Sequence, residues 1–162
     1  MKGTEELRQA LAVWLTERDV PAACAWPENQ RMKAGEAVAV ISLRQMEGSS
    51  PGFQDYLGER YDPELGRWVE LYGKRVKLTF GVDLYAATAH RVGLGLDRAA
   101  EVLGAGRPAG LKMLTFSAGE TAYQKDNRRY YCPAQAVFEA WAFGRVGEDG
   151  TFLDFEVRGA MK

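Results

Sequence analysis

The fold is decided by residues 52–86, GFQDYLGERYDPELGRWVELYGKRVKLTFGVDLYA. In the second half of this stretch, apolar and polar positions alternate without interruption. One face of an extended chain would carry Val76, Leu78, Phe80, Val82 and Leu84, and the other face would carry the residues between them. An alternation of this length, rich in β-branched and aromatic side chains, predicts a long antiparallel strand with one face on a core.

The first half of the stretch predicts an aromatic β-hairpin. Residues 53–61 and 67–72 flank the sequence DPELG, in which Pro63 presets a turn φ and Gly66 accepts a positive one. Strand geometry gives each arm a reach of roughly 25 to 30 Å, enough to project beyond a small domain. We expect residues 47–74 to form a projecting hairpin that runs directly into the core strand.

Two helices are expected around this stretch. Thr4 is a candidate N-cap, and apolar residues follow it with helical spacing at Leu7, Leu11, Trp14 and Leu15. Thr88 can cap a second helix that ends at Gly104 and has a buried stripe of Val92, Leu96, Ala99 and Leu103. Gly93 and Gly95 would each weaken this helix by about 1 kcal/mol relative to Ala, or would permit close packing on the sheet.

Further strands are indicated along the rest of the chain. They fall at residues 22–26, 36–46, 111–123, 130–143 and 151–157, with turns or loops at 27–35, 104–110, 124–129 and 147–150. Strands outnumber helices and follow one another through short turns. The sequence therefore predicts one α+β domain over residues 1–162, with a mostly antiparallel sheet and two helices packed on one side of it.

Composition limits the classes of function. A chain of 162 residues, 46% hydrophobic and 27% charged, fits one domain that can bury about 70% of its unfolded surface. The net charge of −1 argues against a dedicated nucleic-acid binder. Cys24 and Cys132 are isolated in sequence, and no signal peptide or membrane-spanning run is recognisable, so we expect reduced thiols in a cytosolic product without a membrane partner.

No catalytic, metal or cofactor signature is found. His90, the single histidine, falls in the first turn of the second expected helix without a visible activating partner. Zinc would need three or four suitably spaced ligands, and a phosphate-binding loop would need a Gly-Lys-Ser or Gly-Lys-Thr sequence. Carboxylates at Asp62, Glu64, Glu70 and Asp83 alternate with Arg and Lys, which is typical of a solvated sheet face. We therefore expect neither an enzyme nor a bound cofactor or metal.

The positive signal is the aromatic content of the hairpin. Residues 47–72 contain six acidic and two basic side chains, and among them stand Phe53, Tyr56, Tyr61, Trp68 and Tyr72. Aromatic residues are enriched at protein interfaces because they offer a large rigid contact area at low entropy cost. These five are the candidate protein-interface residues. The alternative is that their rings only pack across the two strands of the hairpin.

The chain resembles the tail terminators of long-tailed phages and prophages, also called tail completion or minor tail proteins. The resemblance rests on the order of elements and on the local sequence pattern of two segments, residues 53–86 and FLDFEVRG at 152–159. It implies an α+β subunit of the virion, made in the bacterial cytoplasm, that forms a six-fold ring at the head-proximal end of the tail. The ring would stop growth of the tail tube and dock the head connector or neck protein.

Two residue sets follow from this resemblance as hypotheses. The aromatic hairpin would contact the next subunit or the tail-tube protein. The acidic side chains Glu59, Asp62 and Glu64 would face the lumen of the ring, where negative charge would keep DNA, present only as passing cargo, from sticking.

Two alternatives remain open from the sequence. One is another neck or head-tail joining protein, since such subunits have a similar size and class of fold. The other is a small monomeric ligand-binding module or enzyme with a pocket between sheet and helices, for which Tyr85, Tyr123 and His90 are the residues to inspect.

Overall fold

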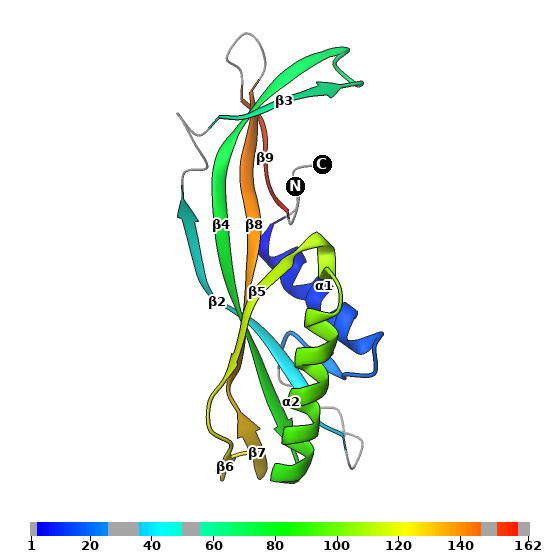
Figure 1. Cartoon of the computed structure of the whole chain (residues 1–162), viewed down its shortest axis with the longest axis vertical. Helices are drawn as coiled ribbons and strands as arrows, with labels where there is room; N and C mark the ends of the chain where they lie inside the picture. The colour runs from blue at the N-terminus through cyan, green and yellow to red at the C-terminus, as the bar shows by residue number, and fades with distance from the viewer. Residues whose placement is uncertain (1–2, 26–35, 50–55, 147–151, 159–162) are drawn as a thin grey trace.

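Strand β4 (Arg67–Ala86) is the spine of the structure, a computed structural model that describes residues 3–25, 36–49, 56–146 and 152–158. It is one continuous strand of 20 residues that begins in a hairpin at one end of the molecule and ends beside a helix at the other (Figure 1). Its hairpin partner is β3 (Tyr56–Asp62), and the two pair antiparallel. The expected hairpin and the expected core strand are both confirmed, and the second arm of the hairpin is continuous with the core strand in β4. The expected start of the hairpin at residue 47 is wrong, because residues 47–49 pair with β4 as the end of another strand, β2 (Val38–Ser49).

Two long strands flank β4, one on each side. Antiparallel β2 (Val38–Ser49) lies along one edge of β4, and antiparallel β8 (Ala134–Val146) lies along the other. The far edge of β8 pairs with β5 (Lys112–Ala118) and with β9 (Phe152–Arg158), again antiparallel. The two-residue strand β1 (Ala22–Ala23) adds to β2 in the parallel direction. The α+β class with a mostly antiparallel sheet is therefore confirmed.

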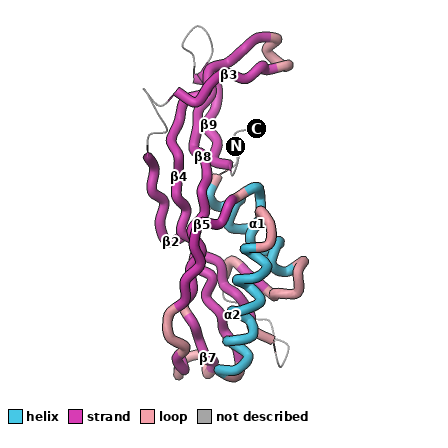
Figure 2. The backbone as a smooth tube through the Cα atoms, in the orientation of Figure 1, coloured by secondary structure: helices cyan, strands magenta, loops and turns pink. Residues whose placement is uncertain are grey.

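Both helices cover the same side of the sheet (Figure 2). Helix α1 (Thr4–Thr16) turns its apolar stripe toward the sheet, and α2 (Ala89–Gly104) packs beside β4. The Thr88 hydroxyl accepts a hydrogen bond from the Arg91 amide at 3.2 Å, so the predicted cap of α2 is confirmed. The prediction for α1 is wrong at its first residue. Gly3 is the N-cap of that helix, and Thr4 is already helical.

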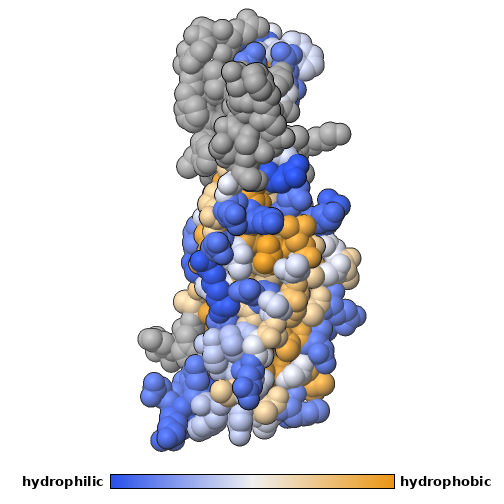
Figure 3. All heavy atoms as spheres, turned by 60° about the vertical axis from the view of Figure 1, so that its left-hand side comes forward, coloured by the Kyte–Doolittle hydropathy of each residue, from blue (hydrophilic) through white to orange (hydrophobic). Residues whose placement is uncertain are grey.

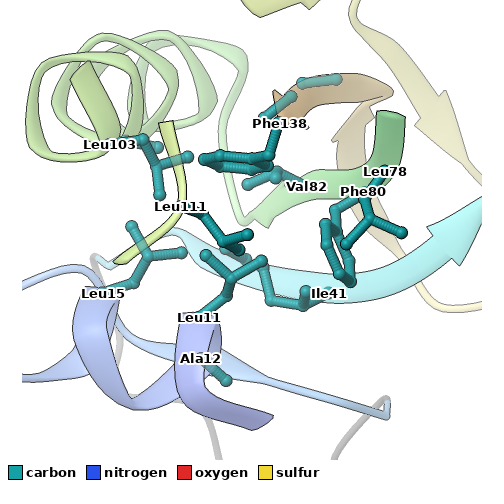
Figure 4. Close-up of a cluster of buried hydrophobic side chains, with 14 of the residues drawn as sticks. Leu11, Ala12, Leu15, Ile41, Leu78, Phe80, Val82, Leu103, Leu111 and Phe138 are labelled. Carbon is teal, nitrogen blue, oxygen red and sulfur yellow. The ribbon is translucent and has the colours of Figure 1, made fainter. Parts of the chain in front are cut away.

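The core lies between the helices and the sheet (Figure 4). Its largest fully buried side chains come from every layer: Phe80, Phe138, Leu11, Leu15, Ile41, Leu78, Leu84, Leu103 and Leu111. Cross-strand register brings Ile41 opposite Val82 and Phe80 opposite Ala136, so a bulky side chain on β4 meets a small one on β8. From Val76 to Ala86, the even-numbered face of β4 is buried as the alternation predicts, because a strand turns every second residue to the same side.

Two expected strands are each divided in two. Residues 111–123 form β5 and β6 (Ala122–Gln124), and residues 130–143 form β7 (Arg129–Cys132) and the first part of β8. The second break falls at Pro133, which has no N–H to give to a strand ladder. The Pro133 carbonyl instead accepts a hydrogen bond from the Gly119 amide at 2.7 Å. The hairpin of β6 and β7 continues the sheet beyond this break, because β7 also pairs with the end of β4.

Other expected segments lie outside the described residues, namely the loops at 27–35 and 147–150 and the first part of the aromatic segment, which includes Phe53. The expected strand 36–46 is confirmed as β2, which continues to Ser49. A register shift between Leu43 and Gln45 interrupts its pairing with β4, so Arg44 is the bulged residue. The bulge is a feature that the alternation of the sequence does not reveal.

Candidate assembly surface

The turn of the β3–β4 hairpin is held by Asp62. Its carboxylate oxygen Oδ1 accepts hydrogen bonds from the amides of Glu64, at 2.9 Å, and Leu65, at 3.2 Å. The Asp62 carbonyl also accepts from the amide of Gly66, whose φ of 64° lies in the left-handed region that glycine adopts without strain. Sequence reasoning anticipated the turn at this place. It did not anticipate that Asp62 would be buried, with only 5% of its surface exposed.

The two faces of this hairpin differ in character. One face carries Asp62 and Val69, both buried. The opposite face carries Tyr61 and Trp68, which lie directly across from each other in the two strands. Their rings meet edge to face, with centroids 5.7 Å apart and an interplanar angle of 69°. The hairpin therefore presents one aromatic pair on a face that the rest of the described chain does not cover.

The exposed fractions of Tyr61 and Trp68 distinguish them from rings that only pack across the two strands of a hairpin. Tyr61 is 48% exposed and Trp68 is 56% exposed, although each contacts the other. Leu65, at the tip of the turn, is 46% exposed. An edge-to-face pair stabilises a hairpin by about 0.5–1.5 kcal/mol, but about half of the surface of each of these two residues remains in water. This area is available to a partner.

Carboxylates border the aromatic pair. Glu59 lies directly opposite Glu70 in the two strands and shares the face of Tyr61 and Trp68, and Glu64 is exposed in the turn. The basic residues of the hairpin, Arg60 and Arg67, fall on the other face and are partly buried. We define the acidic hairpin as residues 59–70. Its outer face combines rigid aromatic area with negative charge.

The remaining predicted interface and lumen residues have the following positions. Tyr56 and Tyr72 lie opposite each other at the base of the hairpin, and only their backbone is described. Phe53 lies outside the described residues. Of the three acidic side chains expected to face a lumen, Glu59 and Glu64 are exposed, whereas the Asp62 carboxylate is occupied by the backbone of its own turn.

The residues of the alternative pocket do not converge. Tyr85 packs against Tyr131, with ring centroids 5.0 Å apart, and Tyr123 packs against Tyr130, with centroids 5.2 Å apart. His90 is exposed on the first turn of α2. A hollow of about 190 Å³ does lie between α2 and residues 19–21, which follow α1, but its lining includes Arg91 and Arg98 and does not include these three residues.

A polar network on the open face of the sheet was not anticipated. The Asp83 carboxylate forms an ion pair with Arg44 of β2 and accepts a hydrogen bond from the Ala134 amide at 3.3 Å. The Arg44 guanidinium donates in turn to the Ala134 carbonyl at 3.1 Å. The bulge in β2 positions Arg44, and the break at Pro133 frees the Ala134 amide, so the network depends on two irregularities of the sheet. It links three strands and has a structural role.

Beside this network, burial raises the pKa of Tyr85 and Tyr131 above the ordinary value of 10.0, and the negative charge of Asp83 adds to the effect. Tyrosines of the unfolded chain ionise first, so the stabilising contribution of these two groups is present below pH 10 and is lost as the pH rises through their folded pKa. We expect the tyrosinate absorbance of the folded protein to include a late component above pH 10. The double variant Tyr85→Phe/Tyr131→Phe should lose that component, and an unchanged titration curve in this variant would contradict the assignment.

Other kinds of site are not supported by the described part of the chain. It contains no group of three or more His, Cys, Asp or Glu residues that could hold a metal ion. Cys24 and Cys132 are both free thiols. None of the helices in the described ranges is long and apolar enough to span a bilayer.

Comparisons with known proteins add no relative. No protein-family model matches the chain, and no curated protein matches it in sequence. The class of protein is therefore inferred from the surface itself and from the resemblance carried by the sequence.

Proposed function

We propose that the chain is a structural phage tail protein, a tail terminator that caps the head-proximal end of the tail tube as a ring. In this role it ends polymerisation of the tube and offers a docking surface to the head connector or neck protein. No catalytic step belongs to this function. The function depends on contacts between subunits and on contacts with the tube.

The observation that carries the proposal is the acidic hairpin. It projects from one end of an elongated subunit, it is continuous with the spine of the sheet, and it presents an exposed aromatic pair (Figure 1). A two-stranded hairpin has little stability of its own in water, so an exposed aromatic face at its tip favours a packing partner outside the chain. Such an arm suits a subunit of a ring, because a heterologous contact joins two different surfaces of neighbouring copies.

The proposal predicts binding to the tail-tube protein encoded by the same genome. We expect light scattering to show a ring-sized species, either with the chain alone or only after the tube protein is added. Tyr61→Ala/Trp68→Ala should weaken assembly of this species by about thirtyfold or more, because an aromatic residue at the centre of an interface contributes about 2 kcal/mol or more. A second pair from the aromatic interface set, Tyr56 and Trp68, can be tested in the same way with Tyr56→Ala/Trp68→Ala.

A matched control is available on the other side of the molecule. Leu94 of α2 is also 56% exposed, and Leu94→Ala should leave binding to the tube protein unchanged. Normal assembly by Tyr61→Ala/Trp68→Ala would contradict the role of the hairpin. Binding to a connector or neck protein, with no binding to the tube protein, would instead assign the chain to the head-tail joining proteins.

A further inference from the structure

The molecule carries a second hairpin at the end opposite the acidic hairpin (Figure 1). It consists of β6, β7 and the turn between them, and we define the basic hairpin as residues 122–132. Its sequence, AYQKDNRRYYC, holds three basic residues, Lys125, Arg128 and Arg129, against one acidic residue, Asp126. The acidic hairpin holds four acidic and two basic residues, so the two hairpins are opposite in charge.

The turn of the basic hairpin is closed by its own hydrogen bonds. The Asn127 side-chain amide donates to the side-chain oxygen of Gln124 at 2.9 Å, and Arg128 has a positive φ of 53°. Lys125 and Arg128 are exposed, and no carboxylate in the described ranges forms an ion pair with either of them. Hydrophilic side chains also project from the lower end of the molecule in the space-filling view (Figure 3). Two solvated cations thus stand at the tip.

An exposed aromatic side chain accompanies these cations. Tyr123 is 52% exposed and packs edge to face against Tyr130, at an interplanar angle of 62°. Tyr130 in turn packs against the core. The basic hairpin therefore has the same composition of surface as the acidic hairpin, a supported aromatic ring beside exposed charges, but with the opposite sign.

We propose that these two hairpins bind each other in successive copies of this chain. The Tyr61 and Trp68 face of one subunit, bordered by Glu59 and Glu64, packs against Tyr123, Lys125 and Arg128 of the next. The hairpins lie at opposite ends of one subunit, so they meet only between copies. Opposite charges orient the contact, and the apolar area of the rings supplies the burial.

This inference rests on the proposed function, for which it identifies the partner of the acidic hairpin. The contact joins two different surfaces, which is the kind of contact that closes into a ring when the rotation between copies permits. It also places Glu59 and Glu64 at a contact between subunits, whereas the hypothesis from the sequence directs them to a lumen. A polyanion such as DNA would use the basic hairpin alone and would leave the acidic hairpin without a partner.

Charge reversal tests the contact directly. The experiment measures self-association of the full chain, without tube protein, by sedimentation over a concentration series. We expect Glu59→Lys/Glu64→Lys and Lys125→Glu/Arg128→Glu each to weaken self-association by about tenfold or more, because like charges then face each other. All four positions are exposed and outside the core, so both variants should keep the unfolding curve of the unaltered chain.

Mixing the two variants gives the decisive result. One variant then has two basic ends and the other has two acidic ends, so an equimolar mixture should regain self-association that neither variant shows alone. The quadruple variant, with both ends reversed, should also regain it. Asp97→Lys and Lys112→Glu, which reverse exposed charges on α2 and β5, should leave self-association unchanged. Raising the salt concentration should weaken the contact of the unaltered chain.

Three results would overturn the inference. The unaltered chain could remain a monomer at every concentration, the two variants could associate like the unaltered chain, or the mixture could stay monomeric. Binding of duplex DNA that is lost in Lys125→Glu/Arg128→Glu, with self-association unchanged, would assign the basic hairpin to nucleic acid instead. A monomer that still binds the tube protein would overturn this inference and leave the proposed function standing. A chain that self-associates through the two hairpins but does not bind the tube protein would overturn the proposed function and leave this inference standing.

Discussion

Phe80→Ala is expected to lower the free energy of unfolding by about 3–5 kcal/mol, the largest effect that we predict for this chain. Phe80 is completely buried at the centre of β4, and its ring meets that of Phe138 edge to face with centroids 6.1 Å apart. Removal of the ring leaves a cavity between the sheet and the helices, and it also removes the aromatic contact. Since a domain of this size is stable by about 5–15 kcal/mol in total, the variant should be close to unfolding.

Urea denaturation measures this effect as a lower midpoint with an unchanged slope. The matched control is Trp68→Ala, which removes an aromatic ring of larger size from an exposed position of the same strand. Its cost should be about 1 kcal/mol, because Trp68 is 56% exposed and its ring contact is the edge-to-face pair with Tyr61. Equal losses of stability in the two variants would contradict the division of β4 into a core segment and an assembly segment.

Gly95→Ala is expected to destabilise the protein by about 1–3 kcal/mol, although alanine is the better helix former. A methyl group at this position would lie 2.5 Å from the Cβ of Ala37 and 3.3 Å from a methyl group of Leu84. Neither neighbour is the end of a long flexible side chain, so α2 would have to move away from the sheet. The measured quantity is again the midpoint of urea unfolding.

Gly93 of the same helix provides a matched control for this prediction. A methyl group at Gly93 would have no heavy atom within 4 Å, so Gly93→Ala should stabilise the protein by about 1 kcal/mol through helix propensity alone. Two glycines in one helix, two positions apart, should thus respond with opposite signs. Stabilisation by both substitutions would show that α2 does not pack on Ala37 and on Leu84 of β4 as closely as the structure has it.

These glycines also illustrate how much of the fold could be predicted from the sequence. The period-two pattern of β4 and the helical spacing of α1 and α2 are local signals, and they identified those elements and their buried faces. The same local signals suggested two explanations for Gly93 and Gly95, and only the distance to Ala37 selects between them. That distance depends on how α2 lies across the sheet, which no local pattern specifies.

The irregularities of the sheet were beyond local prediction for the same reason. The bulge at Arg44 and the break at Pro133 bring Arg44, Asp83 and Ala134 into one network, although they are separated by up to 90 positions. Pro133 itself was a visible signal, since a proline in the middle of a predicted strand favours a break. Arg44 offered no such signal, because its role depends on the partner strand.

Some features of the candidate surface could likewise be predicted from the sequence, and others could not. The aromatic content of the hairpin and its turn at 62–66 could be predicted, because both are properties of adjacent residues. The pairing of Tyr61 with Trp68, their common exposed face and the burial of Asp62 required the register of β3 on β4. The role of the basic hairpin could not be predicted from the sequence, because it depends on the position of this hairpin at the end of the molecule opposite the acidic hairpin.

The central position of β4 has a consequence for how the chain folds. This strand is flanked by β2, which precedes it, and by β8, which follows it. Paired residues of β4 and β8 are 54 to 76 positions apart, as the pairs Gly81 with Gln135 and Glu70 with Val146 show. During synthesis, the β8 edge of β4 has no partner until β8 leaves the ribosome. Contacts of such long sequence separation slow folding and leave a strand edge open to other chains. The last third of the sequence therefore acts as the closing step of folding, and a subunit becomes safe from aggregation only when that step is complete.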